Sequence, residues 1–149
     1  MNTMKSSSRE QREIERYVFA EVEDMLQVSL QSNPKVFLSE GVHIEPDFYS
    51  KEAKIVGEIF AHHGKTKGGQ NHKVAQDILK MLLWEKTQGI TYRKFLVVCD
   101  KQMEKVLTGK SALAESIRQF GIILLCVELP EELRDKILKA QNRQMMINN

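Results

Sequence analysis

Residues 42–62 read VHIEPDFYSKEAKIVGEIFAH and contain two extended runs, Val42–Tyr49 and Lys54–His62. The short polar connection between them, residues 50–53 (SKEA), predicts a tight turn, so the two runs are expected to form a β-hairpin. Just upstream, Val36–Leu38 predicts one more strand. Together these runs predict a three-stranded antiparallel meander near the start of the chain.

Helical and buried segments lie on both sides of this meander in the sequence. Apolar residues recur at helical spacing from about Arg9 to Gln31, and again from about Gln70 to Thr87. The continuous apolar runs Phe95–Cys99 and Ile122–Leu129 are typical of strands that are covered on both faces. Further helices are predicted over residues 101–120, with a break near Thr108-Gly109, and over residues 131–145.

This order of elements predicts an α/β fold with three layers, in which helices flank a mixed five-stranded sheet. The sheet is expected to be antiparallel in the meander and parallel beyond it. The length of 149 residues and the hydrophobic share of 42% suit one globular domain. We therefore expect a single domain over residues 10–149, preceded by a flexible polar leader over residues 1–9.

Composition excludes several classes of protein. The 22 Lys+Arg and 20 Asp+Glu residues give a net charge of +2, which argues against an arginine-rich or histone-like binder. No apolar run approaches the roughly 20 residues needed to cross a bilayer, and the polar N-terminus is unlike a secretory signal. Cys99 and Cys126 lie in apolar runs and are interpreted as reduced core residues. These features predict a cytoplasmic protein without membrane contact.

Two carboxylates on the predicted hairpin are the candidate metal ligands. A two-residue loop at 51–52 would place Asp47 opposite Val56. Because side chains alternate along a strand, Asp47 and Glu58 would then be diagonal neighbours on one face, where they could share a Mg²⁺ ion. A shift by one residue would put them on opposite faces. The alternative is that both are solvated and that the Pro-Asp pair only marks a strand end.

These residues, in this order of elements, resemble the PD-(D/E)XK nuclease superfamily, which has the restriction-endonuclease-like fold. Pro46-Asp47 matches the first half of the family motif, and Glu58-Ile59 begins the second half. The resemblance implies that Mg²⁺ or Mn²⁺, bound by Asp47 and Glu58, activates a water that attacks a phosphodiester bond. The chain departs from the family pattern at Phe60, where a lysine usually stands, and this departure puts catalysis in doubt.

Glu21 is the candidate for a third metal ligand. It falls inside the apolar stripe of the predicted first helix, where a carboxylate is costly unless it is paired or bound to a metal. The resemblance implies that an acidic residue of the first helix often completes the metal site. The alternative is that Glu21 lies at the edge of the stripe and reaches solvent or an arginine.

The segment from Ala61 to Lys73 contains three lysines and three histidines but no acidic residue. Its glycines allow the backbone to approach a phosphate closely. Lys65 and Lys73 are equal candidates to replace the missing lysine, and the resemblance gives Gln70 the task of orienting the water. The candidate contacts to nucleic acid are Lys65, Lys67, Lys73 and His62. The alternative is that these side chains are only solvated.

The sequence therefore predicts a metal-dependent nuclease-like domain that acts on nucleic acid, DNA in the first place and RNA otherwise. The main alternative is an inactive module of the same fold that binds nucleic acid or a protein partner, which Phe60 favours. A third alternative is a structural protein whose last helix, with Met145 and Met146, packs against a second copy. Fine sequence specificity of the nuclease would require either a homodimer or a partner.

Overall fold

The computed structural model describes residues 2–62 and 68–148. The helices in these residues are α1 (Asn2–Leu26), α2 (Gly68–Gln88), α3 (Lys101–Leu107), α4 (Ala112–Gln119) and α5 (Glu131–Asn148). The strands are β1 (Gln31–Ser32), β2 (Val36–Ser39), β3 (Val42–Ile44), β4 (Phe48–Ser50), β5 (Ile55–Phe60), β6 (Arg93–Val98) and β7 (Ile122–Cys126). This order confirms the predicted α/β class.

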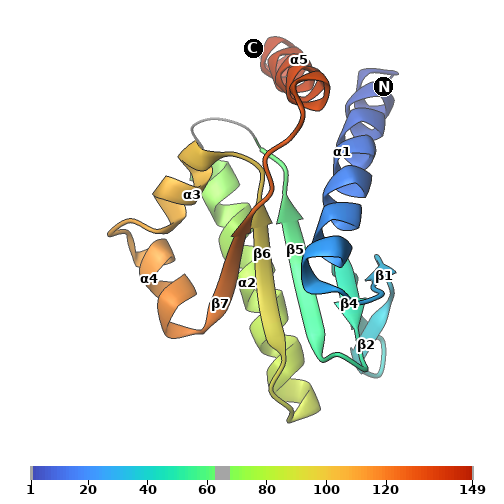
Figure 1. The fold of residues 1–149 in the computed structure, drawn as a ribbon, viewed down its shortest axis with the longest axis vertical. Coiled ribbons are helices and arrows are strands. Elements are labelled where there is room, and N and C mark those ends of the chain that lie inside the picture. Colours follow the sequence, from blue (N-terminus) through green and yellow to red (C-terminus); the bar gives the residue numbers. More distant parts are fainter. Residues whose placement is uncertain (1, 63–67, 149) are drawn as a thin grey trace.

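The main sheet has five strands in the order β1-β4-β5-β6-β7 (Figure 1). β4 is antiparallel to β1 and to β5, whereas β5, β6 and β7 are parallel, so the predicted mixed sheet is confirmed. The prediction that Val36–Leu38 belongs to this sheet is wrong, because β2 pairs with β3 in a separate two-stranded sheet. The position beside β4 that was predicted for Val36–Leu38 is occupied by β1. The run 42–49 divides into β3 and β4 around Pro46, which lacks the N–H that a ladder needs.

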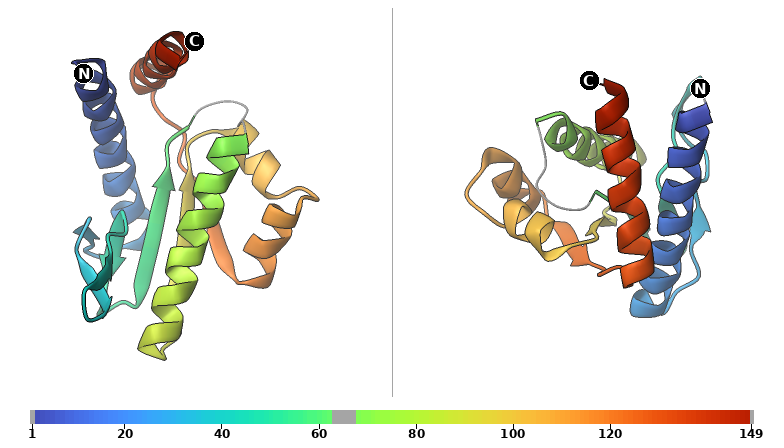
Figure 2. Two further views of the ribbon diagram at one scale, coloured as in Figure 1. Left: turned by 180° about the vertical axis from the view of Figure 1, so that it is seen from behind. Right: turned by 90° about the horizontal axis from the view of Figure 1, so that it is seen from above.

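Helices cover both faces of the main sheet. α1 lies over one face, and α5 lies beside α1, past the C-terminal ends of the parallel strands; α2, α3 and α4 lie over the other face (Figures 1 and 2). Alternate residues of β5 point into these two layers: Ile55 and Ile59 pack towards α1, and Val56 and Phe60 pack towards α2. Glu58 has the same parity as Val56 and Phe60, so it faces α2.

Gly57 allows β4 and β5 to pack closely. The Phe48 side chain is fully buried, and its ring lies directly over Gly57. A Cβ atom at position 57 would come within 2.0 Å of Phe48 Cζ. A glycine at this position therefore fixes the β4 strand, and the residue that precedes it, against β5.

The first helix differs from the sequence pattern at both ends. α1 begins at Asn2, earlier than the predicted start near Arg9, and ends at Leu26, before the predicted end near Gln31, which lies in β1. The predicted break in residues 101–120 is confirmed: α3 ends at Leu107, and the Ser111 side chain caps α4 by accepting a hydrogen bond from the Ala114 N–H at 3.0 Å. Among the described residues, no helix combines the length and apolar character needed to cross a membrane.

Candidate functional site

The β4–β5 hairpin brings Asp47 and Glu58 together through a register that differs from the predicted one. Ser50 pairs with Ile55, so the turn has four residues instead of two. Continuing this ladder past the end of β4 places Asp47 directly opposite Glu58. The difference from the prediction is an even number of residues, and an even shift leaves both carboxylates on one face.

The Asp47 side chain is held at the point where β4 ends. Its Oδ2 accepts a hydrogen bond from the Ile59 N–H at 2.7 Å. Because β4 begins only at Phe48, the carboxylate takes the place of the backbone partner that this N–H would otherwise need. The carboxyl groups of Asp47 and Glu58 lie close enough for each to affect the ionisation of the other, and one proton on the pair relieves the repulsion between two negative charges.

This proton follows from the surroundings of the pair. Glu58 is only 4% exposed. Burial, followed by the negative charges of Asp47 and Asp77, raises the pKa of Glu58 to about 9. Burial also raises the pKa of Asp47, against the effect of the Ile59 N–H. The carboxyl pair therefore holds a proton at neutral pH, as coupled acids in close contact do.

α2 supplies the charged groups that face Glu58. Asp77 and Lys80 are three residues apart and so lie on the same side of the helix. Lys80 Nζ lies 3.2 Å from Asp77 Oδ1 and 3.8 Å from Glu58 Oε1. Burial disfavours the charge of Lys80, but the carboxylates of Glu58 and Asp77 outweigh it and raise the pKa of Lys80. The ammonium group therefore stays charged between the two acids.

Asp77 is the most deeply buried acid of the site, with 2% of the residue exposed. Its Oδ2 accepts no hydrogen bond from the described residues, and Lys73 Nζ lies 3.5 Å away. A buried carboxylate oxygen without a hydrogen bond is costly, and the ion pair with Lys73 offsets part of that cost.

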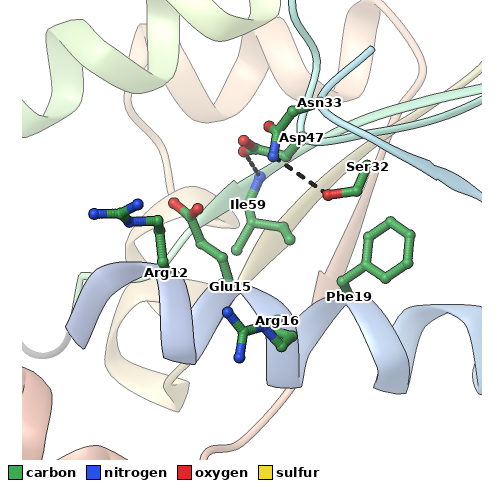
Figure 3. A pocket seen from close by; sticks show the side chains of 8 residues that line it. All are labelled: Arg12, Glu15, Arg16, Phe19, Ser32, Asn33, Asp47 and Ile59. Carbon is green, nitrogen blue, oxygen red and sulfur yellow. Dashed lines mark hydrogen bonds between the residues drawn. The ribbon is translucent and has the colours of Figure 1, made fainter. Parts of the chain in front are cut away.

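On its other side, Asp47 faces α1. A pocket of about 350 Å³ opens there, lined by Arg12, Glu15, Arg16, Phe19, Ser32, Asn33, Asp47 and Ile59 (Figure 3). Burial, and then the charge of Asp47, raises the pKa of Glu15. The acid that α1 brings to Asp47 is thus Glu15. The predicted Glu21 lies six residues further on, about 120° around the helix axis, and does not line this pocket.

The other predicted site residues are only partly brought together. Phe60 is 4% exposed and belongs to the core under α2, with its ring centroid 5.9 Å from that of His62. Lys73 is exposed on α2 and reaches Asp77 instead of Glu58. Gln70 lies in the first turn of α2. Two predicted residues lie outside the described residues: Lys65 and Lys67.

Three charged residues of the site are missing from the sequence prediction: Glu15, Asp77 and Lys80. Asp77 carries the same signal that drew attention to Glu21, since it falls inside the apolar stripe of its helix, between Val74 and Met81. Lys80 follows Asp77 by one turn. Glu15 gives no such signal, because it directly follows a buried position at the edge of the α1 stripe.

The donor set fits a hard divalent cation. Carboxylate oxygens are the ligands that Mg²⁺ prefers, and Mg²⁺ commonly keeps several waters beside one or two carboxylates. Asp47 and Glu58 would hold it. Within residues 2–62 and 68–148, no three acidic, histidine or cysteine side chains form a ready metal-binding cluster. The predicted trio of Asp47, Glu58 and Glu21 is therefore not assembled in the structure.

The chain was compared with protein-family models, with curated proteins and with solved structures, and none of them matched.

Proposed function

We propose that this chain is a metal-dependent nuclease-like domain that hydrolyses phosphodiester bonds, with DNA as the first substrate to test and RNA as the second. The observation that carries the proposal is the close approach of the Asp47 and Glu58 carboxyl groups at the end of the β4–β5 ladder, with Lys80 Nζ 3.8 Å from the Glu58 carboxylate. Two acids and an amine at one place have the composition of the PD-(D/E)XK motif. Lys80 would then supply the positive charge that Phe60 cannot.

Mg²⁺ or Mn²⁺ bound by Asp47 and Glu58 would supply an activated water and stabilise the charge that develops on phosphorus. Glu58 would release its proton when it becomes a ligand, since a carboxylate must be ionised to bind a cation. Lys80 would hold a positive charge beside the attacked phosphate, and Asp77 would fix its position and keep it protonated. Lys73 lies one turn before Asp77 on α2 and is exposed, so it can contact the nucleic-acid backbone.

The second candidate function is an inactive module of this fold that binds nucleic acid or a protein partner. Two observations favour it: Phe60 is a core residue, and the Lys80 ammonium already neutralises part of the acidic charge. A site that is satisfied internally has less need of a metal ion. The two candidates differ in whether the acids bind Mg²⁺ and whether a phosphodiester bond is cut.

Cleavage of plasmid DNA, single-stranded DNA and RNA with Mg²⁺ or Mn²⁺ tests the enzyme. Asp47→Asn and Glu58→Gln are expected to abolish cutting, and Lys80→Met to reduce it about a hundredfold. Glu45→Gln is the matched control, because Glu45 is an exposed carboxylate two residues before Asp47. Cutting that survives the loss of Asp47 and Glu58 would refute the proposed site.

Titration calorimetry separates the two candidates without any cleavage. If Glu58 holds a proton at neutral pH and then binds Mg²⁺, about one proton should be released for each ion bound. Measurements in two buffers with different heats of ionisation count that proton. Nucleic-acid binding with neither Mg²⁺ uptake nor cutting would favour the module.

We also propose a cytoplasmic site of action and a homodimer. Cys99 and Cys126 are free thiols, which suits a reducing compartment. The end of α5 exposes Met145, Met146 and Ile147, which could pack against a second copy. Light scattering over a dilution series tests the dimer, and a mass that stays at one chain throughout would exclude it.

A further inference from the structure

We propose that the pocket between α1 and the β1–β4 strands binds one unpaired nucleotide of the substrate strand, next to the phosphate that the proposed function places at Asp47. This inference rests on the proposed function, because it takes nucleic acid as the ligand. It goes further by naming the form of the substrate: a strand with an unpaired or terminal nucleotide, as opposed to a continuous duplex.

The two walls of the pocket suit a nucleobase. Phe19 lines the α1 side, and Ser32 and Asn33 line the side of β1 (Figure 3). Asn33 Nδ2 donates a hydrogen bond to Ser32 Oγ at 3.3 Å, which holds the amide at this wall. An aromatic ring can stack on any base, and an amide can bond the edge of the base.

The charges along α1 give the strand a direction. Arg12 and Phe19 lie at opposite ends of the pocket, with Asp47 between them (Figure 3). Their seven-residue separation corresponds to about 10 Å along the helix axis. A phosphate would be drawn to the guanidinium groups of Arg12 and Arg16 and repelled by the carboxylate of Glu15. The uncharged base would therefore lie at the Phe19 end.

A backbone hydrogen bond connects the polar wall of the pocket directly to Asp47. The Asn33 N–H donates a hydrogen bond to the Asp47 carbonyl oxygen at 3.3 Å, so the polar wall is tied to the residue that holds the metal site. Asn33 adopts a left-handed backbone conformation with φ of 50°, which turns the chain from β1 towards Pro34. A base bound at Asn33 would thus set the position of the next phosphate at Asp47.

A base that enters this pocket cannot stay stacked and paired inside a duplex. Extruding a paired base costs a few kcal/mol, whereas an unpaired or terminal base pays little. The pocket therefore selects strands that already present a base without a partner. The ligand class that follows is a single strand, an overhang or a flap.

Fluorescence anisotropy with labelled oligonucleotides tests this without cleavage, using the full chain in EDTA. Phe19→Leu is expected to weaken binding of a single strand about tenfold and to leave a blunt duplex of the same sequence unchanged. Phe37→Leu is the matched control, because Phe37 is 63% exposed on β2 and lies outside the pocket. An abasic nucleotide in the strand should weaken binding to the wild-type chain but not to the Phe19→Leu variant.

If Phe19→Leu weakens binding of single strand and duplex equally, or weakens neither, the proposed nucleotide pocket is refuted, even if the wild-type chain cuts plasmid DNA. Single-strand binding that depends on Phe19, without any cutting, would leave the pocket standing and refute the nuclease. If a free nucleoside monophosphate competes for the pocket as well as the unlabelled strand does, the ligand is a mononucleotide and the proposal of a nucleic-acid strand is refuted. Phe19 packs partly against the core, so if thermal melting shows that Phe19→Leu is unfolded, Asn33→Gly replaces it with the same expectation, because glycine tolerates the left-handed backbone at this position.

Discussion

Replacing Glu58 with glutamine is expected to stabilise the protein at neutral and alkaline pH. The Glu58 carboxyl is buried, and burial together with the charges of Asp47 and Asp77 raises its pKa from an ordinary 4.5 to about 9. In the unfolded chain the same carboxyl ionises near its ordinary value. Between these two values the native state holds a proton that the unfolded state has lost, so the free energy of unfolding falls as pH rises.

The size of the effect follows from that window. Each pH unit inside it costs about 1.4 kcal/mol, so stability should fall by about 4 kcal/mol from pH 5 to pH 8 through this group. Glutamine resembles the protonated acid and does not titrate. The Glu58→Gln variant should therefore match the wild-type chain near pH 5 and exceed it by about 4 kcal/mol at pH 8, a large share of the total stability of an ordinary domain.

Urea unfolding followed by circular dichroism at several pH values measures this difference. Glu15 also titrates, and subtracting the variant curve from the wild-type curve removes its contribution. Asp47 titrates together with Glu58, so the difference curve reports the carboxyl pair. Glu45→Gln is the control, and its curve should run parallel to that of the wild-type chain. Parallel curves for Glu58→Gln and the wild-type chain would refute the buried, protonated state of Glu58.

Two further substitutions test the packing around the site by urea unfolding. Gly57→Ala is expected to lower the free energy of unfolding by about 1–3 kcal/mol, because its Cβ would lie 2.0 Å from a buried ring. Gly109→Ala is the control, because its Cβ would meet its nearest atom at 3.4 Å. An equal loss of stability in both variants would contradict the clash with Phe48 as the cause. Lys94→Met is expected to cost about 2 kcal/mol, because the Lys94 ammonium bonds Glu85 at 2.8 Å. Lys86→Met, at an exposed position of α2, should change little, and a Lys94→Met variant as stable as this control would show that the ion pair contributes nothing.

The element order could be predicted because each element has a strong local signal. The continuous apolar runs at Phe95–Cys99 and Ile122–Leu129 require cover on both faces, and helical spacing identifies the helices that provide it. The register of the hairpin could not be predicted in this way. Its turn is four residues long and includes Lys54 in a left-handed conformation with φ of 57°, although no glycine or asparagine marks the position.

The candidate site was predictable only where its residues lie on neighbouring strands. Asp47 and Glu58 could be related because pairing and alternation fix which face each residue takes. Glu15 and Lys80 reach the same place from two different helices, and that meeting depends on how α1 and α2 pack on opposite sides of the sheet. Such packing is a tertiary property that no local spacing encodes.

The same packing explains why the positive charge of this site is carried by Lys80 and not by position 60. Position 60 has the same parity as Glu58 and therefore points into the layer under α2, where Phe60 is 4% exposed. An ammonium group there would have to lie within the apolar core, which is costly for a charge. Lys80 approaches the same carboxylate from the helix above, with its stem along the core and its charge between two acids. What a phosphoryl-transfer site needs is a cation close to the acid, whichever element carries it. If Lys80→Met lowers cutting as expected, the phenylalanine at position 60 no longer favours the inactive module.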